Sequence, residues 1–338
     1  MRNFARPILA TFALIWTSGP VAAQSLAFVL PIDCDAGKTC FVQNYVDVQT
    51  GPDARDYLCG NATYDGHTGT DIRLLDVPAA SKGVVVRAAA PGVVAKTREG
   101  VADHMVETEA DAERVTSYGL GNAVIIDHGD GWQTIYGHLR KGSLKVRSGD
   151  SVEAGAPIGL VGLSGLTEFP HVHFEVRHNG KLVEPFTGQE EGTGCKADLG
   201  RATAGALWEK AIVDALASTE TRILQVGFAG ASVSPKDLES GLQADKIAGP
   251  TSAGLVFYAR LMNMHEGDQL HFVLDGPGDW QQDHATAPID RAKATYVGFA
   301  GKKLTAKRWP AGRYIGRVEL YRAGRMVAAA EDELTLPE

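Results

Sequence analysis

The sequence predicts a mainly β protein built from two domains. The chain has 338 residues, and because a domain usually takes about 150 residues, this length suggests two of them. Between residues 61 and 188, runs rich in valine and isoleucine alternate with glycine turns, as in GVVVRAAAPGVVAKT and GNAVIIDHGDGWQTIYGHL. Strand-length runs bounded by Gly, Asn and Asp at this density indicate an all-β domain. Five or more further strands after residue 221 suggest a second, smaller immunoglobulin-like β-sandwich.

The first 23 residues have the pattern of a secretory signal peptide. A basic start is followed by an apolar stretch from Ile8 to Trp16 and by small residues that end at Ala23, after which we expect cleavage. The apolar stretch is shorter than the ~20 residues that a membrane span needs. No later segment is long and apolar enough, so we expect no span after signal removal. The protein is therefore expected to be exported, to the periplasm or the extracellular space.

Residues 24–60 are polar, rich in Gly and Asp, and carry three of the four cysteines, which predicts an irregular segment. In an oxidising compartment an even cysteine count suggests disulfides, and four cysteines allow three pairings. We favour Cys34–Cys40 as a local loop and Cys59–Cys195 as a clasp that joins the two ends of the histidine-bearing region. A cysteine metal site is the rival interpretation, and no CxxC spacing supports it.

The rest of the chain divides by its patterns. Residues 98–117 are charged and poor in large apolar residues, which predicts an exposed insertion at a hairpin tip. HNGK at 178–181 is typical of a type I′ hairpin turn, and the apolar spacing in 204–218 predicts a short helix. The expected segments are a signal peptide (1–23), the cysteine-containing segment (24–60), the histidine-bearing β domain (61–200), a connecting helix (201–220) and the second β domain (221–338).

Composition narrows the classes of partner. The net charge of −8 would become −10 once Arg2 and Arg6 leave with the signal peptide. An acidic chain without clusters of Lys and Arg argues against nucleic acid and against anionic lipid as partners.

Three short motifs carry the side chains that suggest chemistry. His67 and Asp71 lie in HTGTD, His138 lies in IYGHL, and His171 and His173 lie in FPHVHFEV. Residues two apart in a strand point to the same face, so His171 and His173 would project into one cleft. Two imidazoles buried within an apolar strand need polar partners, because an unpaired buried polar group costs free energy. Two imidazoles and one carboxylate can hold a metal with a position left open, which indicates a metal-dependent hydrolase.

Other polar residues receive plainer interpretations. Glu175 could be proposed as a general base, but we expect it to be a structural residue or one that orients a metal ligand. We expect Asp127 and His128 to serve a turn. The remaining histidines are expected to be solvated or to lack ligand-like spacing: His104, His178, His265, His271 and His284.

Residues 61–188 resemble the lysostaphin-type (LytM-domain) zinc metallopeptidases, whose pattern is HxxxD, then a histidine in a Tyr-x-His-Leu setting, then HxH. The resemblance implies a LytM-type antiparallel β-sandwich or hybrid-barrel catalytic domain. It further implies one Zn²⁺ ion bound by His67, Asp71 and His173, with His138 and His171 as the catalytic histidines. Zinc would activate a water for attack on a peptide bond, one of these histidines would take its proton, and the other would stabilise the oxyanion.

The resemblance also implies a substrate, the cross-links or stem peptides of peptidoglycan. One alternative is a non-hydrolytic LytM-like regulator that binds cell wall or activates an amidase. Another is a metallopeptidase that acts on ordinary proteins. The second β domain could bind glycan or a protein partner, or only pack against the first. Residues 24–50 could lie across the groove as an inhibitory cover.

Overall fold

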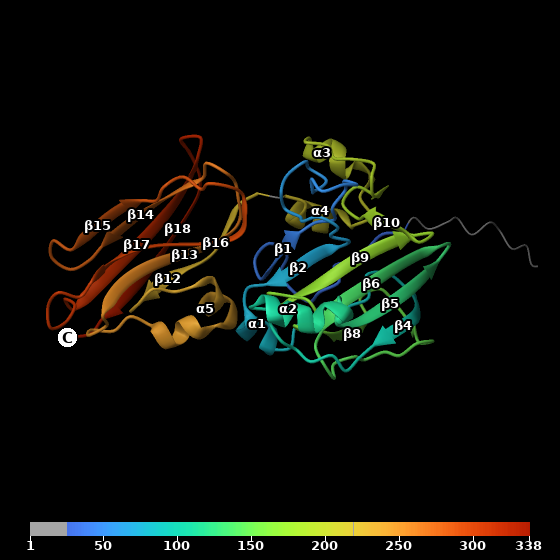
Figure 1. Cartoon of the computed structure of the whole chain (residues 1–338), viewed down its shortest axis with the longest axis horizontal. Coiled ribbons are helices and arrows are strands. Elements are labelled where there is room, and N and C mark those ends of the chain that lie inside the picture. Colours follow the sequence, from blue (N-terminus) through green and yellow to red (C-terminus); the bar gives the residue numbers. More distant parts are fainter. Residues whose placement is uncertain (1–25, 219) are drawn as a thin grey trace, which may run out of the picture.

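The computed structural model describes residues 26–218 and 220–338, so the expected signal peptide lies outside the described residues (Figure 1). The chain is mainly β, which confirms the predicted fold class. Within the described residues, no helix has the length and apolar character needed to cross a membrane.

A nine-stranded antiparallel sheet carries the three motifs. Its main path runs in the order β1 (Cys40–Asn44), β2 (Thr70–Leu74), β9 (His171–His178), β6 (Trp132–Leu139), β5 (Asn122–Gly129), β4 (Gly92–Arg98) and β7 (Ser151–Val152). From β9 it branches to β10 (Lys181–Glu184) and β11 (Gln189–Glu190), while β3 (Val85–Arg87) and β8 (Pro157–Leu160) form a separate pair.

Strand β9 shows why this sequence positions a site. Val172, Phe174 and Val176 pack into the hydrophobic core of the first β region, which is the part of the chain that contains the nine-stranded sheet. The alternate residues His171 and His173 therefore lie on the opposite face of the strand, because successive side chains point to opposite sides. The apolar alternation thus fixes which way the two imidazoles face.

The C-terminal strands form two sheets that share one core. One sheet has the order β12 (Arg222–Ala229), β13 (Gly254–Met264) and β16 (Lys293–Lys303); the other has the order β15 (Gln281–Ala285), β14 (Gln269–Asp275), β17 (Gly312–Arg322) and β18 (Arg325–Leu336). Phe257 and Leu261 of β13 pack with Phe272 of β14 and Val318 of β17. This is the packing of a β-sandwich.

The helices are short. They are α1 (Val77–Ser81), α2 (Glu109–Val115), α3 (Leu199–Ala202), α4 (Lys210–Leu216) and α5 (Pro235–Ser240), with the 3₁₀ turns η1 (Thr116–Tyr118), η2 (Thr203–Gly205) and η3 (Leu242–Lys246). The helix predicted within 204–218 is interrupted at residues 206–209. There the carbonyl of Leu207 accepts from the N–H of Phe28, and the N–H of Leu207 donates to the carbonyl of Pro185. The range therefore holds only the end of η2 and the helix α4, in which Ile212 and Leu216 are buried.

Two further expectations need correction. The segment 24–60 is not wholly irregular, since β1 lies in it and pairs with β2. The insertion at 98–117 is not a bare exposed loop: it contains α2, capped by reciprocal hydrogen bonds between Thr108 and Asp111. Its backbone is also fixed to the first β region, because the N–H of Val106 donates to the carbonyl of Thr167 at 2.8 Å.

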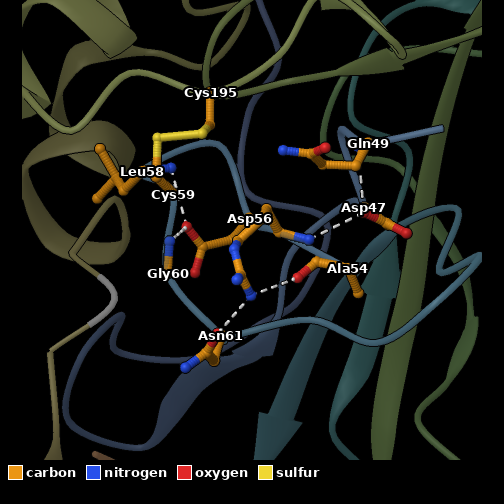
Figure 2. Close-up of a disulfide and its surroundings, with 10 residues drawn as sticks. Asp47, Gln49, Ala54, Asp56, Leu58, Cys59, Gly60, Asn61 and Cys195 are labelled. Carbon is orange, nitrogen blue, oxygen red and sulfur yellow. Dashed lines mark hydrogen bonds between the residues drawn. A yellow bond between two sulfur atoms is a disulfide. The ribbon is translucent and has the colours of Figure 1, made fainter. Parts of the chain in front are cut away.

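Both favoured disulfides are confirmed, Cys34–Cys40 and Cys59–Cys195. Figure 2 shows Cys59 in a turn where Asp56 accepts hydrogen bonds from the N–H groups of Leu58 and Gly60. Cys59 has φ of 66°, which this Asp-centred turn stabilises. The disulfide therefore joins the N-terminal segment to the chain just after the nine-stranded sheet.

Candidate metal centre

Strand register brings the three motifs together. Asp71 of β2 is the cross-strand partner of His173 of β9, and His173 also faces Gly137 of β6, next to His138. The glycine in HTGTD has a specific role, because a Cβ on Gly69 would lie 2.5 Å from Nε2 of His173. The sequence therefore needs glycine where the first motif passes the third.

All five predicted site residues lie in one buried cluster. Two groups of side chains offer donor atoms within 4.8 Å of one another: His67 with Asp71 and His173, and His138 with His171 and His173. The first group is the predicted ligand set, and the second contains both predicted catalytic histidines. Both groups of this kind found among the described residues are at this one place.

Three of the four imidazoles are oriented by backbone carbonyls. Nδ1 of His67 lies 2.7 Å from the Tyr45 carbonyl, Nδ1 of His138 2.8 Å from that of Ser164, and Nδ1 of His171 2.9 Å from that of Phe169. A carbonyl only accepts, so each Nδ1 donates its proton and, in the neutral ring, Nε2 keeps a lone pair. This fixes the tautomer, as is usual for metal-ligating histidines.

The environment of His67 fits a bound cation. Its Nε2 is buried and has no hydrogen-bond partner, yet it lies 3.0 Å from Oδ2 of Asp71. If His67 is neutral, its Nε2 lone pair faces a carboxylate oxygen at this distance, which is unfavourable unless a proton or a cation lies between the two atoms. A divalent ion bound by both atoms would remove the conflict, so the residues present fit zinc.

His173 is held from both sides. Its Nδ1 lies 2.9 Å from Oδ1 of Asp71, and its Nε2 lies 3.7 Å from Oε2 of Glu175. Glu175 is buried and is itself paired with Arg177. Glu175 therefore lies behind the ring of His173, in a position to orient it.

The charges of the cluster follow from burial and from neighbours. Burial alone would raise the pKa of Asp71, but His67, His171 and the hydrogen bonds from His171 and His173 outweigh it and hold that pKa well below its usual value. Burial, and then the imidazoles of His171 and His173, keep the pKa of His138 well below its usual value. Burial lowers the pKa of His173, but hydrogen bonds with Asp71 and Glu175 outweigh it and raise the pKa to about 9.

His138 has an unusual backbone. Its φ is 58°, a left-handed conformation that is uncommon for a residue other than glycine. The N–H of His138 donates to the carbonyl of Leu120 at 2.7 Å, at a register shift in the pairing of β5 with β6. The ring centre consequently lies 4.5 Å from that of His171. Backbone strain of this kind is frequent at functional sites.

Sequence reasoning missed Asn44. Its side-chain amide donates to Oδ2 of Asp71 at 2.9 Å, and Asn44 is the cross-strand partner of Asp71 in β1. It fixes the carboxylate from the side away from His173. The segment was expected to be irregular, so no local signal pointed to this residue.

The cluster opens into a cleft of about 400 Å³. Among the side chains that line it are Tyr64, Asp71, His138, Phe169 and His171. No part of the described 24–50 segment other than Gln43 and Asn44 lines the cleft. The expected inhibitory cover therefore stays a prediction without structural support.

The remaining predicted polar residues lie outside the cluster. His128 contacts the Pro91 carbonyl and Thr134 near its turn. His178 is half-buried against Trp132, with ring centres 4.2 Å apart, so the expectation that it is simply solvated was wrong. His271 pairs with Asp283 on the C-terminal strands.

Residues 65–185 match the model of Peptidase family M23. The DD-carboxypeptidase/endopeptidase Mpg of Neisseria meningitidis serogroup B is 37% identical over 124 residues, which are 36% of this chain and 23% of that protein. The murein hydrolase activator EnvC of Escherichia coli is 40% identical over 67 residues, 20% of this chain and 16% of that protein. This chain thus covers less than a quarter of either relative.

Two solved structures are also similar. The catalytic domain of the prophage-encoded M23 protein EnpA from Enterococcus faecalis, in a mutant form, is 27% identical and covers 44% of this chain and 95% of its own, with a TM-score of 0.29. The catalytic domain of the antimicrobial peptidase lysostaphin from Staphylococcus simulans is 23% identical and covers 42% of this chain and 85% of its own, with a TM-score of 0.27.

Proposed function

Residues 65–185 form a domain of peptidase family M23, and from this premise we propose that the chain is an exported zinc metalloendopeptidase that hydrolyses peptide bonds in peptidoglycan. One observation carries the proposal: two imidazoles and a carboxylate meet in a buried cluster beside two further histidines. The naming of one relative as a DD-carboxypeptidase/endopeptidase and of another as a murein hydrolase activator supports peptidoglycan as the setting.

His67, Asp71 and His173 would hold the metal. Bound zinc would supply positive charge that polarises a peptide carbonyl and lowers the pKa of a water molecule. Asn44 keeps the Asp71 carboxylate in place through its 2.9 Å hydrogen bond. The carboxylate of Glu175, 3.7 Å from Nε2 of His173, would favour a proton on that nitrogen and so leave Nδ1 as the ligand atom.

His138 and His171 would move the proton. In both rings Nδ1 is engaged by a carbonyl, so Nε2 is the atom that can accept or donate in the cleft. Burial and the neighbouring imidazoles lower the pKa of His138, so its ring is neutral at neutral pH and Nε2 has a lone pair that could accept a proton. The neighbouring His171, 4.5 Å away between ring centres, is placed to stabilise developing negative charge.

The proposal is tested by mass spectrometry of fragments released from defined muropeptides, with and without a chelator. Zinc-loaded protein should release peptide fragments, and the chelator or His138→Ala should abolish the release. Casein is digested in parallel to test whether the protein also cleaves ordinary proteins. Cleavage of casein without cleavage of muropeptides would contradict peptidoglycan as the substrate.

The alternative function is that of a regulator of other cell-wall enzymes, because part of the domain is similar to a murein hydrolase activator. A regulator would cut neither substrate but would increase the muropeptide release of an added cell-wall amidase. If pure, zinc-loaded protein shows only this stimulation, the regulatory function replaces the enzymatic one. Retention of all five cluster residues favours the enzyme.

A further inference from the structure

The cleft beside the histidine cluster is not made by the M23 domain alone. Ala294 and Thr295 of β16 line it together with His138 and His171. Strand β16 is at the edge of its sheet, as is β1 in the nine-stranded sheet. The two edges are linked, because the side-chain amide of Gln43 in β1 donates to the Ala294 carbonyl at 2.8 Å.

The cleft continues away from the histidines. A second cleft of about 310 Å³ shares Val106, Glu168, Phe169 and Thr295 with the first. Its far side is formed by Pro235 and Lys236 at the start of α5. Together the two clefts form one groove that runs from His171 past Phe169 and Thr295 to α5.

The opposite wall of the groove comes from the 98–117 insertion. Val106 lines both clefts, and Glu107 forms an ion pair with Lys236 that joins the insertion to α5. The groove therefore runs between the insertion on one side and C-terminal residues on the other.

A buried ion cluster fixes the C-terminal wall to the metal-site strand. Arg73 lies on β2, two residues after Asp71, and donates to both carboxylate oxygens of Glu239 on α5 at 2.8 Å. Arg260 of β13 also pairs with Glu239 and donates to the Leu75 carbonyl at 2.9 Å. Both guanidinium groups are fully buried. In Figure 1, α5 accordingly lies below β12 and next to α1.

We propose that the C-terminal β region is a structural part of the substrate groove, and that Thr295 and Ala294 determine which peptides enter it. The occupant rests on the proposed function and is an extended peptide with small side chains, such as a peptidoglycan stem. Thr295 and the apolar side chain of Phe169 both line both clefts. A long side chain at this point would fill the passage between the two clefts.

The test introduces bulk at the wall without touching the metal site. Thr295→Arg is made in the full chain, and Ala294→Arg, at an exposed position, guards against a folding defect at Thr295. Thr335→Arg is the matched control, because Thr335 is an exposed residue of β18 that lines neither cleft. Each variant is combined with His138→Ala, and binding of a purified cross-linked muropeptide is measured by calorimetry. Zinc content and melting temperature are recorded for each.

We expect Thr295→Arg and Ala294→Arg to weaken muropeptide binding by at least about tenfold, with zinc content unchanged. Thr335→Arg should bind as the parent does. In the active background the same loss should appear in KM rather than in kcat, since the wall does not touch the reacting atoms.

Binding within about twofold of the parent for both wall variants would overturn the groove proposal, and so would a parent that binds no muropeptide. Failure of the proposed function has a different signature. In that case zinc-loaded wild-type protein releases no fragments. Muropeptide binding to the His138→Ala chain would still show whether the substitutions at Thr295 and Ala294 block the groove.

Discussion

Oδ1 of Asp71 lies 2.9 Å from Nδ1 of His173, although 102 positions separate the two residues in the chain. They are cross-strand partners in the β2–β9 pairing. A slip of one residue in that register would turn one of the two side chains to the opposite face of the sheet. The site therefore depends on strand pairing, and the apolar residues that set the register of β9 also set the geometry of the cluster.

The first prediction separates metal ligands from proton-transfer groups. His67→Ala and Asp71→Ala should lose most of the bound zinc, because two remaining side chains hold zinc far more weakly than three. His138→Ala should keep its zinc and lose most activity. Zinc is measured by mass spectrometry after dialysis, with His178→Ala as a histidine control outside the cluster. A metal-free His138→Ala protein would contradict the role assignment.

The second prediction concerns the pH dependence of stability in the zinc-free protein. The pKa of His173 is raised from its ordinary 6.5 to about 9, so the folded chain holds that proton more tightly than the unfolded chain. Its contribution to stability is complete below pH 6.5 and is lost as the pH rises through about 9. His138 has a lowered pKa and acts in the opposite direction, since its contribution is lost as the pH falls below its unfolded pKa.

Urea unfolding of chelator-treated protein across this pH range measures the effect. His173→Ala should remove the loss of stability on the alkaline side. Zinc must displace the His173 proton, so calorimetry in buffers of different ionisation enthalpy should show about one proton released per zinc bound at neutral pH. Release of no proton would mean that His173 is unprotonated in the metal-free protein.

The third prediction compares two ion pairs between the same parts of the molecule. Glu239→Gln leaves the buried guanidinium groups of Arg73 and Arg260 without a counter-charge, which should cost about 3–5 kcal/mol of unfolding free energy. Glu107→Gln removes the partner of Lys236, whose side chain is largely exposed, and should cost under about 1 kcal/mol. Urea denaturation measures both. Equal costs would show that the buried cluster does not hold the two regions together.

Much of the site was predictable because its residues occur in short motifs with a local signature. The pattern at His171 and His173 combines strand alternation with two polar side chains, and both properties can be seen in the sequence. The disulfide pairing was also predictable, since one pair is local and the other joins the ends of one region.

The parts that were missed depend on long-range contacts. Asn44 reaches Asp71 only through the pairing of β1 with β2, and Glu239 meets Arg73 only because two distant regions pack together. Neither contact produces a periodic pattern in the sequence. The positive φ of His138 lies at a register shift in the pairing of β5 with β6, and such a shift depends on strand pairing rather than on the local sequence.

The last prediction concerns the two disulfides. Cys59–Cys195 closes a separation of 136 residues and Cys34–Cys40 one of 6. In the chain-entropy account, a cross-link stabilises by restricting the unfolded chain, and the effect grows with the logarithm of the loop length. The long loop then contributes about 5 kcal/mol and the short one about 2 kcal/mol. The double variants Cys59→Ser with Cys195→Ser, and Cys34→Ser with Cys40→Ser, should therefore differ clearly in melting temperature. Equal losses would mean that the disulfides act through native-state packing, since the Cys34–Cys40 loop lies against the core around Cys40.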